Sequence, residues 1–430
     1  MKNLTKFQIV LLAVFVGFII LGVLIFALGK TSRSSKQVEV LVWGTMAEVK
    51  FNQAIKESGL IQNEEIKFTY EEKNPNSFEI EFLEALASDV GPDLFLIRSD
   101  SLLELKDKAL PIPFKSYSEK TFKNSFIEGA EIFLEGESVL ALPISVDPLV
   151  LYWNRGLFNN DGIVEPPKFW DEFYDLGESL TDRGNDLNLR RSAFALGEFA
   201  NVNNAFEILS VLIMQAGNPI TTRSGGFVSS VLGQEMGLPT SPAVRALSFY
   251  TEFSNPLKTF YSWNRSLPWS KNHFLAGDLA IYLGLASELF DIREKNPNLN
   301  FDVANLPQAV EVGSRINYGV IEGVAISKKT LKLAEAFKAA VLLSSAESVA
   351  AFSQVNNLPP PRRDLLSERP ERLFMEVFYD EALIAKPWLV PEKVRAVQIF
   401  KEMIESVSGG RDSVEEAVNR ADNELRLLLK

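Results

Sequence analysis

The sequence predicts a two-lobed α/β protein that follows an N-terminal transmembrane helix. Residues 9–28 form an uninterrupted apolar run, strand and helix patterns alternate over the rest of the chain, and 394 residues remain after position 36. Alternating strands and helices are typical of α/β folds. A chain of this length is too long for one ordinary domain but suits two.

The apolar run Ile9–Leu28 contains twenty residues without a charge. As a helix it would extend over about 30 Å, the thickness of the hydrocarbon core of a bilayer. A secretory signal has an apolar core of roughly 7 to 15 residues, so the length favours a retained signal anchor. A long but cleaved signal is the alternative, because Ala27-Leu28-Gly29 loosely fits a cleavage site. The anchor predicts a single-pass protein of the cell membrane with an extracytoplasmic ectodomain.

The charge of the chain excludes one class of partner. The formal net charge is −12, and the first 36 residues hold five basic and no acidic residues, so the remainder carries −17. A domain this acidic is not expected to bind nucleic acid or an anionic surface through its general charge. The chain has no cysteine, which excludes disulfides, thiolate nucleophiles and thiolate metal sites.

The first hundred residues after the anchor predict three strands and two helices. Strand patterns occupy residues 38–42, 66–70 and 93–97, and helical spacing of apolar residues occurs between them, in the segments 51–55 and 78–86. This order predicts a parallel sheet. Ligands bind beyond the carboxyl ends of such strands, near Trp43-Gly44-Thr45 and Arg98-Ser99-Asp100.

The later segments predict a second lobe and the connections between the two. Residues 139–154 are apolar strand material, interrupted at Pro143 and Pro148, and they predict a crossing between lobes. A proline-rich stretch at 356–361 predicts another crossing. Further elements are expected as helices at 169–180, 205–216 and 331–344, strands at 279–283, 301–303 and 319–326, a Gly/Ser-rich loop at 223–226, and a last helix that opens with the capping box Ser413 to Glu416.

Catalysis and metal binding have little support in the sequence. The single histidine, His273, would have to serve any serine triad alone, and no G-x-S-x-G motif accompanies it. We therefore predict no catalytic residue, no metal site and no cofactor. Paired carboxylates for glycoside hydrolysis stay possible, since the chain has 56 acidic residues.

Aromatic and polar residues near strand ends and crossings are the candidates for ligand binding. Sugar rings present apolar faces that stack on aromatic side chains, while their hydroxyls bond to polar groups. Trp43 follows a strand, and Asp147 is the polar residue of an apolar crossing. The predicted ligand-binding residues are Trp43, Asp100, Asp147, Trp263, Trp269 and Tyr318. Packing is the alternative role for the tryptophans, and a backbone hydrogen bond is the alternative for Asp147.

Several segments, in this order, resemble the extracellular solute-binding proteins of the sugar-binding group, the class that includes maltose-binding proteins. They are the first strand with its exit tryptophan at 38–44, Gly91-Pro92-Asp93 before the third strand, the crossing 141–147 followed by 151–158, the helix start 167–173, and the segments 274–281, 296–307 and 319–327. The resemblance covers nearly all of the chain after residue 37.

The resemblance implies a periplasmic-binding-protein-like fold of type II. The expected lobes are residues 37–146 plus 317–355 and residues 147–316 plus 356–430, after an anchor or signal segment and linker at 1–36. Three crossings are expected, near Val146-Asp147, Ile316–Tyr318 and Asn356–Pro360. A small ligand, expected to be a sugar, would bind in the cleft between the lobes of a monomeric ectodomain. Closure of the cleft would then be recognised by the membrane subunits of an ABC transporter.

Two departures from the family pattern bear on the anchor and on the ligand. The chain lacks the lipobox cysteine by which many relatives are anchored, so the apolar helix would replace the lipid. Gly284 is followed by Leu285-Ala286-Ser287, where relatives often carry an aromatic stacking residue. An anchored polysaccharide-processing enzyme, and a tethered interaction module that has lost its ligand, are the two alternatives.

Overall fold

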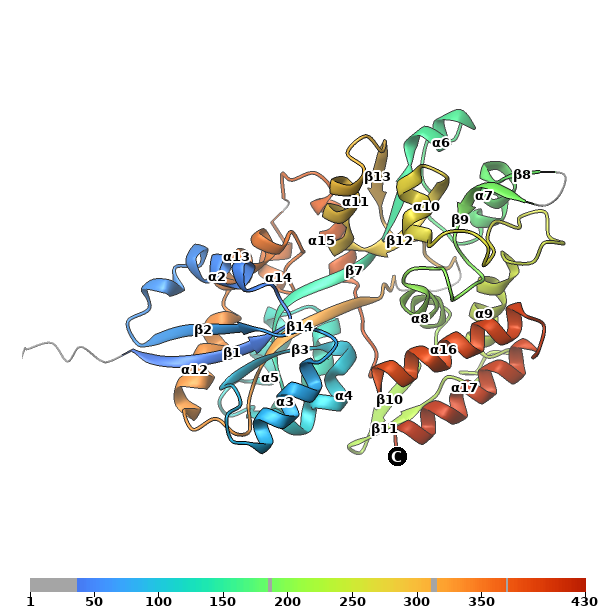
Figure 1. Cartoon of the computed structure of the whole chain (residues 1–430). Coiled ribbons are helices and arrows are strands. Elements are labelled where there is room, and N and C mark those ends of the chain that lie inside the picture. The colour runs from blue at the N-terminus through green and yellow to red at the C-terminus, as the bar shows by residue number, and fades with distance from the viewer. Residues whose placement is uncertain (1–36, 185–187, 311–314, 369) are drawn as a thin grey trace, which may run out of the picture.

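The chain folds into two α/β lobes joined by two long strands (Figure 1). The structure is a computed structural model that describes residues 37–184, 188–310, 315–368 and 370–430. The predicted anchor Ile9–Leu28 lies outside these residues. Within the described ranges no single helix is long and apolar enough to cross a bilayer. The consecutive helices Leu333–Leu343 and Ala346–Asn356 reach the required length and apolar character only together, and they meet at a bend of 60°.

One mixed sheet runs through both lobes. Its strands follow the spatial order β2, β1, β3, β14, β7, β12, β9 and β8, and β13 pairs with the far part of β7. Their bounds are β1 (Val38–Gly44), β2 (Ile66–Glu72), β3 (Leu94–Arg98), β7 (Leu142–Asn154), β8 (Asp182–Arg183), β9 (Leu189–Phe194), β12 (Leu279–Leu285), β13 (Phe301–Ala304) and β14 (Gly319–Ile326).

The first three strands form the parallel part of the sheet, as the sequence predicts. β1 pairs in parallel with both β2 and β3, because α2 (Glu48–Glu57) and α3 (Phe78–Ala87) return the chain to the same edge. The two helices lie on opposite faces of the sheet (Figure 1). The sheet as a whole is mixed, however, because β14 runs antiparallel to both of its neighbours.

The strand β7 is the longest in the chain and passes from one lobe into the other. Residues 142–148 pair with β14, and residues 149–154 pair with β12 and β13. The expected interruption at Pro143 and Pro148 does not occur. Pro143 lies where the register against β14 shifts, and Pro148 faces Gly319, the first residue of β14, so both prolines stand where the ladder is irregular or ends.

Each lobe has its own hydrophobic core. One cluster of buried residues draws on positions 40–146 and 321–352, together with Leu366, Ala382, Ala385 and Leu389. The other draws on positions 149–320 and on residues of the C-terminal region. Two separate cores on either side of a strand pair allow the lobes to move as bodies.

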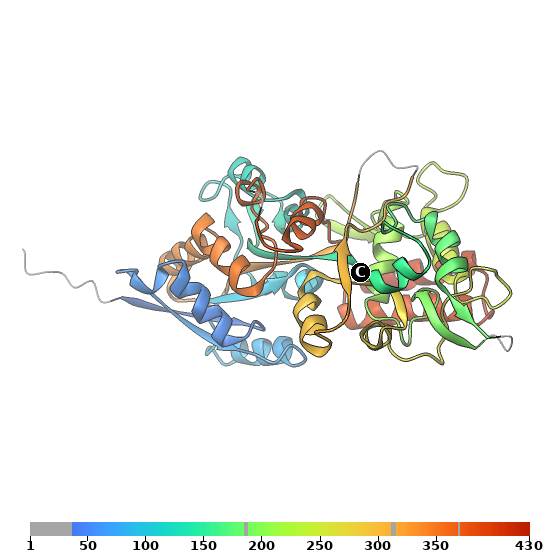
Figure 2. The ribbon, with the colours of Figure 1, turned by 90° about the horizontal axis from the view of Figure 1, so that it is seen from above.

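Helices cover both lobes (Figures 1 and 2). Around the first lobe lie, with α2 and α3, the helices α4 (Leu102–Leu105), α5 (Glu119–Ser125), α12 (Leu333–Leu343), α13 (Ala346–Asn356) and α14 (Arg363–Leu366). The remaining helices are α6 (Arg155–Asn160), α7 (Glu172–Leu180), α8 (Ala205–Gln215), α9 (Pro242–Glu252), α10 (Ser270–Ala276), α11 (Leu289–Lys295), α15 (Met375–Leu383), α16 (Lys393–Ser408) and α17 (Val414–Leu428).

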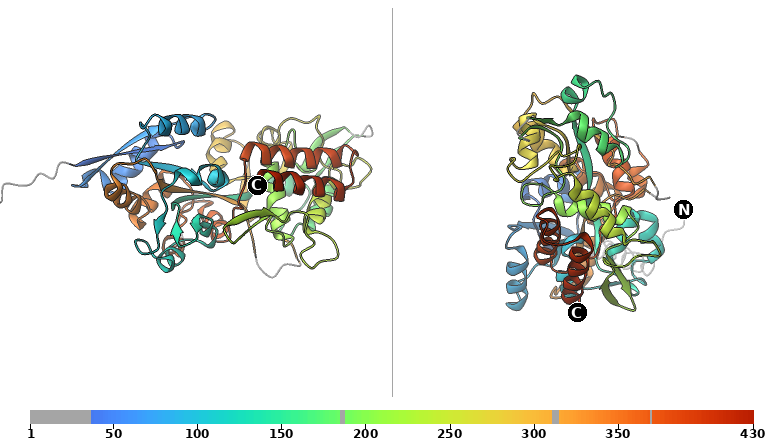
Figure 3. Two further views of the ribbon diagram at one scale, coloured as in Figure 1. Left: turned by 90° about the horizontal axis from the view of Figure 1, so that it is seen from below. Right: turned by 90° about the vertical axis from the view of Figure 1, so that its right-hand side faces the viewer.

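The C-terminal helices α16 and α17 lie side by side along the second lobe (Figure 3). The helix α17 begins at the predicted capping box, in which Ser413 Oγ accepts from the backbone N–H of Glu416, and the Glu416 carboxylate accepts from the backbone N–H of Ser413. Both bonds satisfy donors that a helix start otherwise leaves free, so the sequence signature and the structure agree.

Two segments differ from the sequence-based expectations. The expected loop at 223–226 is the turn of a hairpin between β10 (Thr221–Ser224) and β11 (Phe227–Ser230), where Gly225 and Gly226 supply two positive φ angles of 58° and 85°. Beyond Pro360 the chain continues along the first lobe, because the N–H of Ile127 donates to the carbonyl of Pro361. It therefore turns toward the second lobe later than the expected crossing near Asn356–Pro360.

Candidate functional site

Polar side chains from both lobes meet where the central strands pass between them. β1 and β3 end here, at Gly44 and Arg98, and β14 enters here. The register of the sheet sets Glu322 of β14 between Arg98 of β3 and Ser145 of β7, and it sets Val320 opposite Asp147. We call this region the junction. Its charged and polar residues are Arg98, Asp100, Asp147, Glu207, Tyr318, Glu322 and Lys393.

Asp100 connects the two lobes at the junction. It lies in the short 3-10 helix after β3, and its side chain is 3% exposed. Its carboxylate accepts from Arg98 Nε at 3.1 Å and Nη2 at 2.9 Å, and from Lys393 Nζ at 2.6 Å. Burial alone would raise the pKa of Asp100, but the two cations outweigh it and lower the pKa to about 2. The carboxylate is therefore ionised and paired with a lysine of the other lobe.

A second bond reinforces the same connection. Lys393 is the first residue of α16, so its backbone N–H has no partner inside the helix. This N–H donates to Glu104 Oε1 at 2.8 Å, and Glu104 belongs to α4 of the first lobe. The start of α16 is thus held by two carboxylates across the junction.

Two other carboxyl groups at the junction have no such partners. Glu207 of α8 and Glu322 of β14 form no hydrogen bond or ion pair with another side chain of the described residues. Burial raises the pKa of Glu322 to about 7 in spite of the nearby Arg98, and burial also raises the pKa of Glu207. Carboxyl groups poised in this way can accept or donate hydrogen bonds to an incoming polar solute.

Asp147 and Tyr318 lie on the crossing strands themselves. Asp147 Oδ1 accepts from the backbone N–H of Ser287 at 3.0 Å, which ties β7 to the segment after β12. Burial raises the pKa of Asp147 to about 6, against the effects of Ser287 and Arg98. Tyr318 is 1% exposed, and burial and the carboxylate of Asp100 raise its pKa well above the ordinary range. Burial at the junction therefore disfavours the charged form of Asp147.

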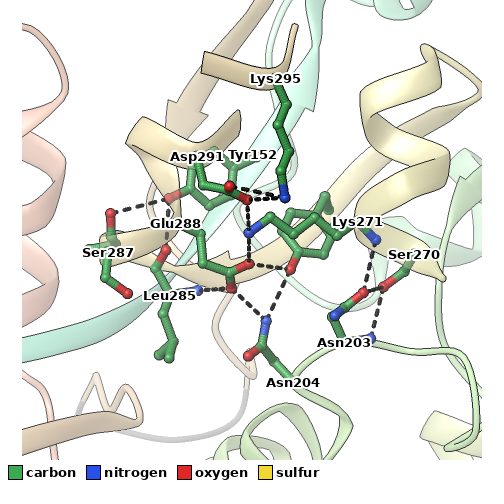
Figure 4. Close-up of polar contacts among 12 residues, drawn as sticks. Tyr152, Asn203, Asn204, Ser270, Lys271, Leu285, Ser287, Glu288, Asp291 and Lys295 are labelled. Carbon is green, nitrogen blue, oxygen red and sulfur yellow. Dashed lines mark hydrogen bonds and ion pairs between the residues drawn. The ribbon is translucent and has the colours of Figure 1, made fainter. Parts of the chain in front are cut away.

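The segment that meets Asp147 is fixed by a polar network around Glu288 (Figure 4). Glu288 Oε1 accepts from Asn204 Nδ2 at 2.8 Å and from the backbone N–H of Leu285 at 3.0 Å. Glu288 Oε2 accepts from the hydroxyl of Tyr282 at 2.7 Å and pairs with Lys271 Nζ at 3.0 Å. This network orders the residues that follow Gly284. This is the segment in which relatives often carry an aromatic residue and this chain has Leu285-Ala286-Ser287.

Four of the six predicted ligand-binding residues lie at or beside the junction, namely Asp100, Asp147, Tyr318 and Trp43, and the other two do not. Asp100, Asp147 and Tyr318 lie at the junction. Asp100 follows β3, Asp147 is on β7 opposite Val320, and the carbonyl of Tyr318 accepts from the backbone N–H of Leu149 at 3.0 Å. Trp43 stands at the end of β1, with Lys73 Nζ 3.6 Å from the centre of its ring. Its indole N–H is buried and has no hydrogen-bond partner among the described residues.

The other two tryptophans belong to the second lobe, and among the described residues neither forms a hydrogen bond or ring contact with a residue of the junction. Trp263 is fully buried, its indole N–H donates to Asn201 Oδ1 at 3.1 Å, and its ring packs edge-on against His273. In this conformation Trp263 presents no free face to a ligand. Trp269 precedes α10 and is 52% exposed.

Three residues of the junction were not among the sequence-based candidates: Glu207, Glu322 and Lys393. Arg98 lies in the segment Arg98-Ser99-Asp100 that was expected near the ligand, although it was not one of the six predicted residues. The signal that pointed to Asp147, a lone charge in an apolar stretch, also marks Glu322 in the strand Gly319–Ile326 and Glu207 in the helix Ala205–Gln215. Lys393 carries no comparable signal, because it begins a helix of ordinary surface pattern.

The described residues hold no group of three or more histidine or acidic residues suited to a metal ion. A cavity of about 440 Å³ does lie between the lobes, on the side of Glu128 and Lys386, whose side chains form an ion pair of 2.7 Å. None of the six predicted residues lines it.

Comparison with known proteins identifies the family. Residues 48–350 match the family described as bacterial extracellular solute-binding protein. The chain belongs to this family. It is accordingly a binding protein and not an enzyme.

Individual proteins similar to this chain are also binding proteins by name. A binding protein from Brucella abortus (strain 2308) and one from Brucella suis biovar 1 are each 25% identical over 319 residues, which is 70% of this chain and 72% of theirs. Solved structures show the same fold. The cyclo/maltodextrin-binding protein with maltotetraose has a TM-score of 0.73 at 18% identity, covering 93% of this chain and 98% of its own.

The cyclic alpha-maltosyl-1,6-maltose binding protein of Arthrobacter globiformis has a TM-score of 0.75 at 16% identity, over 92% of this chain and 99% of its own. The sugar-binding protein MalE of Xanthomonas citri has a TM-score of 0.74 at 19% identity, over 91% and 97%. The two-lobed solute-binding fold expected from the sequence is therefore confirmed.

Proposed function

We propose that this chain is a membrane-anchored, extracytoplasmic solute-binding protein that captures a carbohydrate between its lobes for import by an ABC transporter. Family membership supports solute binding outside the cytoplasm. The solved structures with the same fold are named as binders of maltodextrins and other sugars, which supports a carbohydrate as the class of ligand.

The observation that carries the proposal is the meeting of polar groups from both lobes at the junction. Asp100 and Glu322 come from the first lobe, and Glu207 and Lys393 come from the second. A solute bound there would contact both lobes only while they are closed, so its binding energy would favour the closed state. Carboxylates accept hydrogen bonds from sugar hydroxyls, and Glu207 and Glu322 have that capacity unused.

We further propose Trp43, Asp100, Asp147 and Tyr318 as ligand contacts, with Trp269 as a stacking face and Trp263 as a contact that would need local rearrangement. The proposed lobes are residues 37–146 plus 317–355 and residues 147–316 plus 356–430. The hydrophobic clusters support most of this division up to residue 355, whereas Leu366, Ala382, Ala385 and Leu389 pack in the core of the first lobe. The ectodomain is proposed to be a monomer.

The anchor is part of the proposal. The apolar run Ile9–Leu28 has the length of a membrane span, and the chain has no cysteine for a lipid anchor. Membrane subunits of an ABC transporter would recognise the closed lobes from the same membrane. N-terminal sequencing of membrane-extracted protein tests the anchor, and a mature start near Lys30 would exclude it.

The test of function is a thermal-shift screen of residues 37–430 against a panel of glycans and small solutes. A ligand that binds only the native state adds about 2.7 kcal/mol to the free energy of unfolding when its concentration is one hundred times its Kd. The melting temperature rises as a result. Scattering with the ligand found in this way should show a smaller radius of gyration, and chromatography should recover the ligand unchanged. A cleaved ligand would favour the enzyme alternative, and a panel without any shift would favour the interaction module.

A further inference from the structure

The end of the first lobe farthest from the second lobe carries exposed apolar side chains. β1 and β2 begin side by side at this end; β3 begins farther along, where Leu94 pairs with Val42, and β14 finishes opposite Leu94 because it runs antiparallel to β3 (Figure 1). We call this end of the lobe the distal edge. Its exposed apolar residues are Ile61, Val90 and Leu331, together with Leu333, the first residue of α12; their exposed fractions are 63%, 67%, 99% and 54%.

The strand order places these side chains around the point where the chain enters the lobe. β1 lies between β2 and β3, so the entry at Val38 is flanked by the loop of Ile61 before β2 and by the loop of Val90 before β3. The loop after β14 is adjacent as well, since Lys332 Nζ donates to the carbonyl of Glu39 at 2.7 Å. Lys329 reaches Asp89 at 2.8 Å, which brings the loop of Leu331 beside that of Val90.

The most exposed of these residues is surrounded by lysines. The segment from Lys328 to Leu333 holds three lysines and no acidic residue, in an ectodomain whose net charge is strongly negative. Lys329 and Lys332 pair with acids of the neighbouring loop, whereas Lys328 is exposed and forms no ion pair with the described residues. A leucine that is 99% exposed between lysines is suited to the boundary between lipid headgroups and acyl chains.

An apolar groove continues the same surface. It has a volume of about 580 Å³ and lies between the start of α12 and the segment around Ile112, with Leu333 and Phe337 on one wall and Leu110 and Pro111 on the other. Exposed apolar surface of this kind, rimmed by polar residues, marks an interaction site in a soluble domain.

The short segment between the apolar run and the first lobe limits how far the distal edge can lie from the membrane. Eight residues separate the apolar run, which ends at Leu28, from Gln37. Fully extended, they span at most about 28 Å, so a retained anchor would keep the distal edge close to the bilayer. We propose that the distal edge, with Leu331 at its centre, rests on the anionic lipid surface of the membrane that holds the anchor. This inference rests on the anchor proposed above.

The contact would fix the orientation of the whole ectodomain. The seven residues of β1 rise about 23 Å from the distal edge to the junction. With the distal edge on the membrane, the first lobe would stand still and the second lobe would make the closing movement.

The test uses the full chain in vesicles of phosphatidylcholine and phosphatidylglycerol. Since the chain has no cysteine, Leu331→Cys carries a single polarity-sensitive fluorophore. Leu257→Cys is the matched control, because Leu257 is 90% exposed and lies in the second lobe. We expect the label at position 331 to shift to the blue and to be quenched by spin-labelled lipid. The label at 257 should show neither effect, and omission of phosphatidylglycerol or Lys328→Glu should weaken both effects at 331.

Flotation of the same vesicles separates this proposal from that of the anchor. If the chain floats with the vesicles while the label at 331 behaves like the label at 257, the anchor stands and the lipid contact is overturned. If the blue shift depends on the ratio of protein to lipid and not on the lipid quencher, a second copy covers the edge and the proposal is equally overturned. A chain that does not float removes the anchor and this inference together.

Discussion

Replacing Lys393 by methionine should open the lobes without unfolding either of them. The ammonium group of Lys393 forms the ion pair of 2.6 Å with Asp100 across the junction, and methionine keeps the apolar length of the side chain. Arg98 remains in place with both of its bonds to Asp100, so the substitution leaves no buried carboxylate without a partner. The change therefore acts on the connection between lobes and not on the core of one of them.

The magnitude follows from the exposure of the two partners. A hydrogen bond to a charged group contributes about 1.5–3 kcal/mol, and the lower end applies because Lys393 is 37% exposed. A loss of about 1.4 kcal/mol corresponds to a tenfold shift from closed toward open. The backbone bond from residue 393 to Glu104 remains, which limits the effect to about this size.

The assay is energy transfer between dyes at Val49→Cys in the first lobe and Leu257→Cys in the second, both positions being exposed in a chain without native cysteine. Lys393→Met should lower the transfer efficiency and raise the radius of gyration. Lys338→Met is the control, because Lys338 pairs with Glu65 inside the first lobe. Identical transfer efficiencies in the parent chain, the control and Lys393→Met would refute the role of the pair in closure.

Three further results are expected. Asp147→Asn should weaken ligand affinity more than it lowers the melting temperature; a drop in melting temperature with affinity unchanged would leave Asp147 only its bond to Ser287. Trp263→Ala should cost roughly 3–5 kcal/mol in chemical denaturation, because the ring is fully buried, whereas Trp269→Ala should stay within about 0.5 kcal/mol, and equal losses would contradict these placements. Burial raises the pKa of Glu381 to about 8, so between about pH 4.5 and 8 the folded state keeps a proton that the unfolded state releases, and the melting temperature should fall as pH rises over this range. Glu381→Gln should flatten this dependence of melting temperature on pH, and an unchanged dependence would contradict the role of Glu381.

The regular elements of the fold could be predicted because each carries its own pattern. Phe51, Ala54 and Ile55 have helical spacing, and they are the residues that α2 buries. The direction of β14 could not be predicted, because it depends on where the chain returns between β3 and β7 and not on the residues of the strand. The continuity of β7 was missed because a proline normally breaks the hydrogen-bond ladder of a strand. In β7 both prolines stand where the ladder is already irregular or ends, so the strand continues through them.

The candidate site was predictable where one residue departs from its surroundings. Asp147 stands out in an apolar crossing, and Asp100 follows the end of a buried strand. Trp263 looked like a ligand contact because it lies in a segment of loop pattern, and only the packing of Asn201 and His273 around it shows how deeply it is buried. The pairing of Asp100 with Lys393 joins residues 293 positions apart, and no local pattern reports such a distance.

The central position of β14 also bears on when the chain can fold. β14 separates β3 from β7 in the sheet, although it follows β7 by more than 160 residues in the chain. During synthesis the first lobe therefore lacks a middle strand until residue 326 has left the ribosome, and α12 and α13 come later still. Contacts so distant in sequence form slowly, because a long loop must close before they are made. An exported chain gains from this delay, since a lobe that cannot close its sheet early stays unfolded while it is being moved across the membrane.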